Sequence, residues 1–336
     1  MDLKTLTEIN APSGHEQAIR RFLLDELKKL CFAPVLDRMG NVVVVKEGTG
    51  DAPRKRVMVS AHMDEVGLIV TSATEDGYLR IAAAGGIDPR VLVSKRVTVG
   101  EDKLPGVIGA VPIHLQSAAE RKHVLSMDEL LVDIGAKNKD EAECKAPMGT
   151  YISFDTPYVE YGDGFACGKA FDDRVGCLSL LRLLQEELPV DLVACFVSEE
   201  EVGCRGAKGA AFQQEPDVGI VLEGTTCNDL GDVPETAHVC EAGQGVAVSF
   251  MDGASIANRA LFRKALDVAK QENIPHQVKH SVSGGNDGGA IQRAREGVPV
   301  VVLSVPCRYI HSPSSVVKLS DVESQFALVK ALVKAL

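Results

Sequence analysis

Several residue types are scarce in this 336-residue sequence, and each scarcity excludes a class of protein. Tryptophan is absent and aromatic residues make up only 4% of the chain. Sugar-binding surfaces use the faces of aromatic rings, so a polysaccharide-binding protein is disfavoured. Basic residues are outnumbered, 36 Lys and Arg against 47 Asp and Glu, which gives a net charge of −11. Because nucleic acids and anionic membranes attract basic surfaces, we expect the protein to bind neither.

Paired cysteines and long apolar runs are missing as well. Nine cysteines are scattered without a Cys-x-x-Cys pair, which is typical of reduced thiols and not of a disulfide framework. One of the longest apolar runs, residues 298–305, is far shorter than the ~20 residues of a transmembrane helix. Residues 1–5 show no signal-peptide pattern. We therefore expect a cytoplasmic protein that does not enter a membrane.

Helix-like and strand-like segments alternate in two parts of the chain. Apolar residues at helical spacing predict helices over residues 19–30, 175–188, 259–272, 287–295 and 322–336. Runs rich in β-branched residues predict strands over residues 42–45, 57–61, 192–197, 218–222, 246–250 and 298–305. Such alternation indicates an α/β domain.

The pattern changes between these two parts. Residues 68–110 form short β-like runs separated by Gly and Pro, a texture typical of a small all-β module. The polar segment 117–130 predicts a loop followed by a helix, and residues 137–144 predict a second short helix. We therefore expect an α/β domain formed by residues 1–66 and 158–336, interrupted by a β-rich insertion at residues 67–157.

Polar residues follow the predicted strand at 57–61. His62 and Asp64 are two positions apart, so their side chains point to the same side of an extended backbone. In an open α/β sheet this end of a strand borders the ligand site. A metal-binding histidine usually donates its other ring N–H to a carboxylate or carbonyl, a role that Asp64 fits. On this short motif alone, however, a histidine at a strand end beside solvated acids is the commoner arrangement.

Other acidic residues and a second histidine follow or begin further predicted elements. They are Asp172, Asp173, Glu199, Glu200, Glu201, Glu223 and His311. Each has an ordinary alternative, such as a helix cap, a solvated turn or a capped loop. Two histidines with several carboxylates are nevertheless the ligand types that suit zinc, cobalt or manganese, and they are the groups used by two-metal hydrolases.

Five short motifs occur in a recognisable order: residues 61–67 (Ala-His-Met-Asp-Glu-Val-Gly), 171–174 (Phe-Asp-Asp-Arg), 200–203 (Glu-Glu-Val-Gly), 222–225 (Leu-Glu-Gly-Thr) and 308–313 (Arg-Tyr-Ile-His-Ser-Pro). Together they resemble the tetrahedral aminopeptidases, the glutamyl and deblocking aminopeptidases that have long been confused with endoglucanases. The resemblance extends over essentially the whole chain. One departure is Glu223, where many members have aspartate, and we expect it to change only the reach of the carboxylate.

The resemblance implies a site with two divalent ions, most readily zinc, with cobalt and manganese as alternatives. His62 and Glu223 would hold one ion, Glu201 and His311 the other, and Asp172 would bridge both. Residues that bind the substrate are not identified by the motifs.

Catalytic roles are also implied. Glu200 would be the general base and acid, and Asp64 would orient His62. The resemblance further implies a cis peptide bond between Asp172 and Asp173, with Asp173 facing away from the ions.

The same resemblance implies a fold and an assembly. The α/β part would be a mixed-sheet dinuclear metallopeptidase domain, and residues 67–157 would form a barrel-like dimerisation domain. Dimers would build a twelve-subunit tetrahedral particle that cleaves N-terminal residues from peptides. Three alternatives remain: a metal-dependent deacylase or amidase acting on blocked amino acids, an endoglucanase, which needs two carboxylates flanking a sugar, and a peptide-binding protein without activity.

Overall fold

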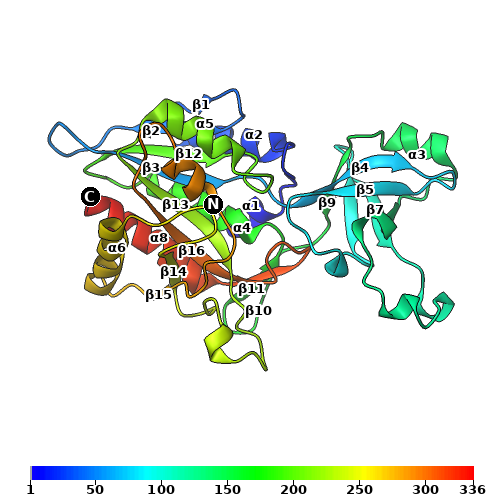
Figure 1. Cartoon of the computed structure of the whole chain (residues 1–336). Coiled ribbons are helices and arrows are strands. Elements are labelled where there is room, and N and C mark those ends of the chain that lie inside the picture. Colours follow the sequence, from blue (N-terminus) through cyan, green and yellow to red (C-terminus); the bar gives the residue numbers. More distant parts are fainter. Residues whose placement is uncertain (1) are drawn as a thin grey trace.

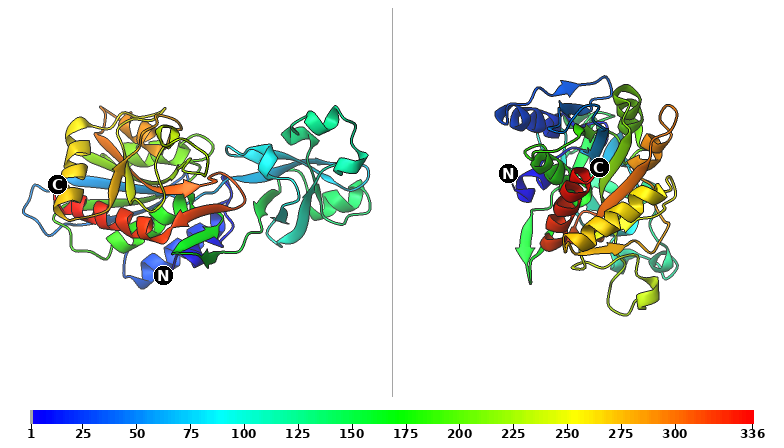
Figure 2. Two further views of the ribbon diagram at one scale, coloured as in Figure 1. Left: turned by 90° about the horizontal axis from the view of Figure 1, so that it is seen from below. Right: turned by 90° about the vertical axis from the view of Figure 1, so that its left-hand side faces the viewer.

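The computed structural model describes residues 2–336 and divides them into two packing units (Figure 1). The larger unit is built on an eleven-stranded mixed sheet, and the smaller unit is a closed six-stranded barrel. Figure 1 and the left-hand view of Figure 2 show the barrel projecting from one end of the larger unit, which carries both chain ends. The expected α/β fold with a barrel-like insertion is confirmed.

Parallel strands form the centre of the large sheet. Its strands are β1 (Val35–Leu36), β2 (Val42–Lys46), β3 (Arg56–His62), β10 (Val159–Tyr161), β11 (Phe165–Gly168), β12 (Asp191–Val197), β13 (Val218–Thr226), β14 (Val246–Ser249), β15 (His276–Val278), β16 (Val300–Arg308) and β17 (Ser315–Lys318). The main order is β1-β2-β12-β3-β13-β16-β17-β11-β10, and β14 and β15 branch from β16. Because β12, β3, β13 and β16 are parallel, their carboxyl ends lie along one edge of the sheet.

Helices cover both faces of this sheet. They are α1 (Leu3–Thr7), α2 (Gln17–Lys29), α4 (Phe171–Leu183), α5 (Arg205–Gln214), α6 (Arg259–Gln271), α7 (Asp287–Gln292) and α8 (Leu319–Lys334). One core contains residues of α1, α2, α4, α6 and α8, and the core on the opposite face contains residues of α5 and α7. In residues 2–336 no helix has the length and apolarity needed to cross a membrane.

Burial on both faces explains the sequence of the central strands. In β3, Val57 and Val59 enter the first core while Met58 enters the second. A strand covered by helices on both sides needs apolar residues at every position, so it reads as a continuous apolar run.

The barrel contains six short strands around a separate core. They are β4 (Gly67–Ala73), β5 (Leu79–Ala84), β6 (Arg96–Val99), β7 (Leu104–Gly109), β8 (Leu131–Asp133) and β9 (Tyr151–Phe154), closed in the order β4-β5-β8-β7-β6-β9. Leu68, Leu79 and Val132 are buried in its core. The barrel core shares no residue with the cores of the large sheet.

Some expectations for local structure were wrong. Residues 117–130 contain no α-helix, only the single 3₁₀ turns Glu120–Lys122 and Met127–Glu129. The residues that pack against the barrel core, Leu125, Met127 and Leu130, lie only in the last part of the segment, so no helical turn before them has an apolar face to bury. The expected short helix at 137–144 is present as α3 (Lys139–Lys145). Helix α5 was not predicted, since its buried residues are small, as at Ala207 and Ala211, and give a weak periodic signal.

Candidate metal centre

Five side chains meet at the carboxyl edge of the parallel strands. His62 ends β3, Glu223 lies in β13, Glu201 follows β12 and His311 follows β16. Asp172 reaches the same place from the first turn of α4. The structure thus brings together all five residues expected to bind metal, although four lie in or after a strand and the fifth in a helix.

Asp172 lies between the two histidines. Its Oδ1 is 3.4 Å from Nε2 of His62, and its Oδ2 is 3.4 Å from Nε2 of His311. A second carboxylate accompanies each histidine: Glu223 Oε2 is 3.5 Å from His62 Nε2, and Glu201 Oε2 is 3.2 Å from His311 Nε2. The five residues therefore form two three-membered sets that share one aspartate.

These sets have the spacing and chemistry of metal sites. Two atoms bound about 2.0–2.2 Å from one tetrahedral ion lie roughly 3.3–3.6 Å apart, close to the observed separations. His62 Nε2 and Glu223 Oε1 are buried without a hydrogen-bond partner. Buried polar atoms are rarely left unpaired, so an additional ligand at this point is physically reasonable. The residues present fit two divalent ions.

The protonation behaviour of the cluster also indicates a lack of positive charge. Burial raises the pKa of Glu223 to about 8, although His62 opposes the shift. Burial would lower the pKa of His311, but Asp172 and Glu201 raise it to about 9. Carboxylates that retain protons and histidines that gain them are typical of a buried acidic cluster, and bound cations would replace those protons.

Asp64 supports the cluster from behind. It is completely buried. Its backbone carbonyl oxygen lies 3.2 Å from His62 Nδ1 and its Oδ1 lies 3.5 Å from the same nitrogen, on the ring side opposite the first metal set. Backbone N–H groups of Glu200 and Glu201 donate to its two oxygens at 3.0 and 3.2 Å. The hydroxyl of Ser13 donates to Asp64 Oδ2 at 2.6 Å. Ser13, in the segment before α2, therefore helps to hold Asp64.

The three consecutive glutamates point in different directions. The chain leaves β12 at Val197, and Glu199 has a left-handed backbone with φ of 55°. Glu199 pairs with Arg205 at 3.1 Å, while Glu201 turns toward His311. Glu200 lines the cavity above the cluster, and burial raises its pKa to about 7. Strand alternation does not apply here because the turn has already begun.

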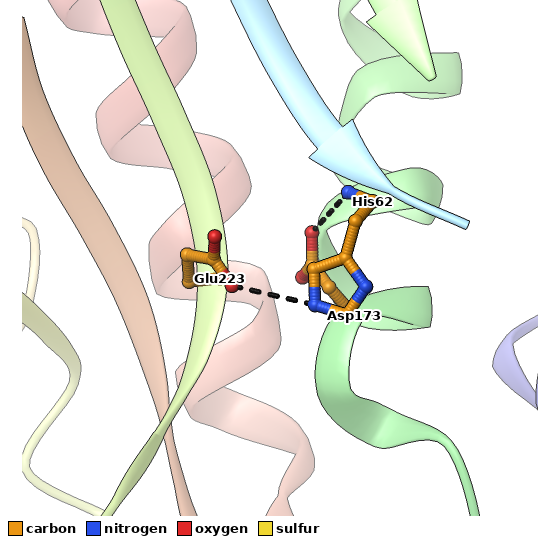
Figure 3. A group of neighbouring side chains, drawn as sticks. All are labelled: His62, Asp173 and Glu223. Atoms are coloured by element: carbon orange, nitrogen blue, oxygen red, sulfur yellow. Dashed lines mark hydrogen bonds and ion pairs between the residues drawn. The ribbon is translucent and has the colours of Figure 1, made fainter. Parts of the chain in front are cut away.

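Asp173 was expected to face away from the ions, but its carboxylate lies in one group with His62 and Glu223. The Asp172–Asp173 peptide bond is cis, as the family resemblance implied. Asp173 accepts the backbone N–H of His62 at 3.2 Å and that of Gly176 at 2.9 Å. Figure 3 shows its carboxylate beside His62, with Glu223 across the imidazole. Its contacts fix the backbone of a ligand.

A cavity of about 410 Å³ opens above the cluster. It is lined by Asp172, Glu200, Glu223 and His311, by Gly86 and Asp88 of the insertion, and by a wall that contains Lys279 and residues 283–286. A larger cavity of about 730 Å³ lies beside α6 and α8 and contains none of the clustered residues. We place the functional site in the smaller cavity because the buried polar groups converge there.

Two further residues near this cavity were not identified from the sequence. Asp287 is buried and neither of its carboxylate oxygens has a hydrogen-bond partner, and it lies beside Glu200 and Cys204. Lys279 contributes an ammonium group to the cavity wall. Neither belongs to one of the five motifs, and the fold brings both to the site.

Two histidines and a shared aspartate at the carboxyl edge of a mixed α/β sheet are characteristic of metal-dependent hydrolases. A family profile described as M42 glutamyl aminopeptidase matches residues 40–328. The chain belongs to this family and is a peptidase, a hydrolase that acts on peptide bonds.

Similar proteins support the same assignment over the full length. The chain is 33% identical to a lysyl aminopeptidase of Pyrococcus furiosus, covering 99% of this chain and 96% of the relative. It is 32% identical to a glutamyl aminopeptidase of Lactococcus lactis, with coverages of 99% and 95%. The endoglucanase alternative is not supported, since the matched family is described as M42 glutamyl aminopeptidase and both of these curated relatives are named aminopeptidases.

Solved structures are similar in fold as well as in sequence. A TET aminopeptidase from a marine sediment thaumarchaeote superimposes with a TM-score of 0.94 at 33% identity, covering 99% of this chain and 95% of that one. The TET1 peptidase of Pyrococcus horikoshii gives 0.87 at 33% identity, with coverages of 99% and 98%.

Proposed function

We propose that this protein is an aminopeptidase that removes N-terminal residues from peptides with the help of two divalent ions. The observation that carries the proposal is the position of Asp172, whose two oxygens face two separate histidines at 3.4 Å each. His62 and Glu223 would complete one ion site, and Glu201 and His311 the other. Zinc is the ion that best matches nitrogen and carboxylate ligands at this spacing, with cobalt or manganese as substitutes.

Glu200 is the proposed general base and acid. When bound, the ions supply Lewis acidity toward the scissile carbonyl and toward water. Glu200 accepts the proton of the attacking water and later gives it to the leaving amine, so the residue is regenerated. It lines the cavity without belonging to either ligand set. The thiol of Cys204 donates to Glu200 Oε1 at 3.3 Å. The backbone N–H of Glu200 donates to Asp64, and this hydrogen bond fixes the position of Glu200.

Asp64 is the proposed positioning residue. It holds the imidazole of His62 on one side and the backbone of Glu200 and Glu201 on the other. Asp64 contacts His62 directly, and it also aligns the turn that carries Glu200 and Glu201. It therefore couples the geometry of the two proposed ion sites.

A free amino group is the substrate feature that distinguishes this proposal from the deacylase alternative. The cavity floor is rich in carboxylates, which favour a substrate that brings a cationic N-terminus. A blocked amino acid carries no such charge. The two curated relatives are named for different N-terminal residues, lysyl in one and glutamyl in the other. The proposed activity therefore does not specify which N-terminal residue is preferred.

Chelation followed by reloading tests the proposed activity. We expect the protein to lose hydrolysis of aminoacyl p-nitroanilides when its metal is removed. Activity should return with Zn²⁺, Co²⁺ or Mn²⁺ at about two ions per chain, as a two-metal site requires. Metal content is measured by mass spectrometry alongside the rates. Preferential cleavage of N-acetylated amino acids would favour the deacylase, and chelator-resistant activity would contradict the metal-dependent mechanism.

We further propose that residues 67–157 form a dimerisation domain that joins two copies of the chain, while residues 1–66 and 158–336 form the catalytic domain. Six such dimers would assemble into a twelve-subunit particle. Three observations support this. The barrel has its own core, so it can act as a separate interface unit. Val111, Ile113 and Leu115 expose 61–70% of their surface on the segment after β7. The related Pyrococcus horikoshii peptidase assembles into a tetrahedron or a large octahedral shell.

Replacing residues 67–157 with a short linker is expected to give a monomer, because the proposed contact surface is removed. Light scattering coupled to size-exclusion chromatography measures the mass, and circular dichroism verifies that the remaining α/β part is folded. A folded deletion variant that keeps the assembly size of the intact chain would show that the contacts lie elsewhere.

A reducing compartment is the proposed location. All nine cysteines are free thiols in the structure, and five of them are buried. Cytosolic proteins keep their thiols reduced, so we propose the cytoplasm.

A further inference from the structure

A second group of metal-ligating side chains lies beside the metal cluster and contains none of its five residues. Glu200, Cys204 and Asp287 each place one possible ligand atom within 4.8 Å of those of the other two. Glu200 lines the cavity, and the half-buried Cys204 lies at the N-terminal end of α5. Asp287 belongs to α7, which packs against α5. The fold thus brings two carboxylates and a thiol together from separate parts of the chain.

The carboxylate of Asp287 is buried without a partner. Only 1% of the residue is exposed, and neither of its oxygens has a hydrogen bond. Burial raises the pKa of Asp287 well above its usual range, with Glu223 adding to the shift and His62 opposing it. A proton on this carboxyl group would still need an acceptor. Because buried polar atoms are rarely left unpaired, a ligand at this carboxylate is physically reasonable.

Cys204 gives the group its preference among ions. Its thiol donates to Glu200 Oε1 at 3.3 Å. A sulfur and an oxygen bound to the same tetrahedral zinc ion lie roughly 3.6 Å apart, so this pair needs little adjustment to hold one. Thiolates favour zinc, whereas manganese prefers oxygen ligands. The group therefore differs in selectivity from the metal cluster, which contains only histidines and carboxylates.

We infer that Glu200, Cys204 and Asp287 form an inhibitory site for an additional thiol-binding cation, zinc above all. On binding, the S–H bond of Cys204 is replaced by a bond from sulfur to the ion, and the proton passes to solvent water. An oxygen of Glu200 becomes a ligand, so this carboxylate no longer accepts the proton of the attacking water. The five residues of the metal cluster keep their own ions. Because Glu200 is the proposed base, the inhibitory effect rests on the proposed aminopeptidase function.

Binding of the additional cation is measured without any substrate. The protein loaded with about two Co²⁺ ions per chain is titrated with further Co²⁺. We expect one more ion to bind, accompanied by a near-ultraviolet charge-transfer band, which a cobalt–thiolate bond produces and nitrogen or oxygen ligands do not. The first two ions should give no such band, since no thiol belongs to the metal cluster. Added Zn²⁺ should abolish the band by displacing the cobalt.

Inhibition is measured with aminoacyl p-nitroanilides. The decisive quantity is the rate in excess metal divided by the rate at two ions per chain, determined separately for each form of the enzyme. Since a general base contributes about 10²–10⁴-fold, saturation with Zn²⁺ should leave less than about 1% of the rate. Enzyme loaded with manganese should keep its rate in excess Mn²⁺, because manganese does not favour a thiolate.

Variants identify the residues that bind the additional cation. Cys204→Ser keeps the size of the side chain and replaces sulfur by oxygen. It should lose the charge-transfer band, and its inhibition should require at least about tenfold more zinc. Asp287→Asn should weaken inhibition in the same direction.

Cys167→Ser is the matched control. Cys167 is half-buried like Cys204, but within residues 2–336 it belongs to no group of metal-ligating side chains. This variant should keep both the band and the inhibition. Thermal unfolding and the content of the first two ions verify that each variant is folded.

Two results would overturn the inference. One is a wild-type protein that shows no thiolate band with excess Co²⁺, which needs no variant to be folded. The other is a band and a zinc inhibition that persist unchanged in Cys204→Ser, which would place the inhibiting ion elsewhere. Both leave the aminopeptidase proposal intact. A protein that shows the band but hydrolyses no p-nitroanilide with any of the three ions would support the cation site and contradict the proposed function.

Discussion

Glu200→Gln is expected to lower kcat by about 10²–10⁴-fold, the usual contribution of general acid–base catalysis. Glutamine has nearly the same size but cannot accept the proton of the attacking water. Since Glu200 belongs to neither ligand set, the variant should still bind about two ions per chain. Steady-state kinetics and metal analysis on the same preparation provide the measurement.

Glu199 and Glu201, the two neighbours of Glu200, provide the controls. Glu199→Gln makes the same chemical change at a residue that pairs with Arg205 away from the cavity, and it should leave kcat within about twofold, as is usual for surface substitutions. Glu201→Gln should weaken metal binding because Glu201 faces His311. Retention of both ions in Glu201→Gln together with loss of one in Glu200→Gln would mean that the two assignments are exchanged.

Asp172→Asn should cause a loss of more than about 10³-fold in kcat/KM. Asparagine offers one neutral oxygen in place of two charged ones, so neither histidine keeps a carboxylate partner on this side. Lewis-acid stabilisation is worth several kcal/mol, and each 1.36 kcal/mol corresponds to tenfold in rate. Isothermal titration calorimetry with Zn²⁺ should show that both binding events are weakened.

Asp64→Asn is the comparison variant for Asp172→Asn and should weaken metal binding less. It alters a residue that contacts His62 from behind without entering either ligand set. Substitutions of such supporting residues usually reduce metal affinity by about 10–100-fold. If Asp172→Asn were folded and still bound two ions as tightly as the wild type, the shared-aspartate arrangement would be wrong.

Much of the architecture was predictable from the sequence because it depends on local patterns. The apolar run from Val57 to Ala61 predicted a strand, and in the structure its residues alternate between two cores. Glycine- and proline-punctuated segments predicted a small all-β module, which the structure shows as the barrel. Helix α5, the strands β17, β11 and β10 at one end of the sheet, and the absence of a helix at 117–130 were not predicted, since small residues and short polar segments carry weak periodic signals.

For the site, the sequence by itself determined which residue types are available and which motifs they belong to: His62 with Asp64, Asp172 with Asp173, and the adjacent Glu200 and Glu201. The tertiary structure alone decided their geometry. Alternation rules fail for the turn after β12, so only the fold shows that Glu200 enters the cavity while Glu199 turns to Arg205. Lys279 is more than fifty positions from any ligand on its N-terminal side, and no motif marks it. The position of Lys279 in the cavity wall depends on long-range packing, which brings together residues whose local sequences contain no information about one another.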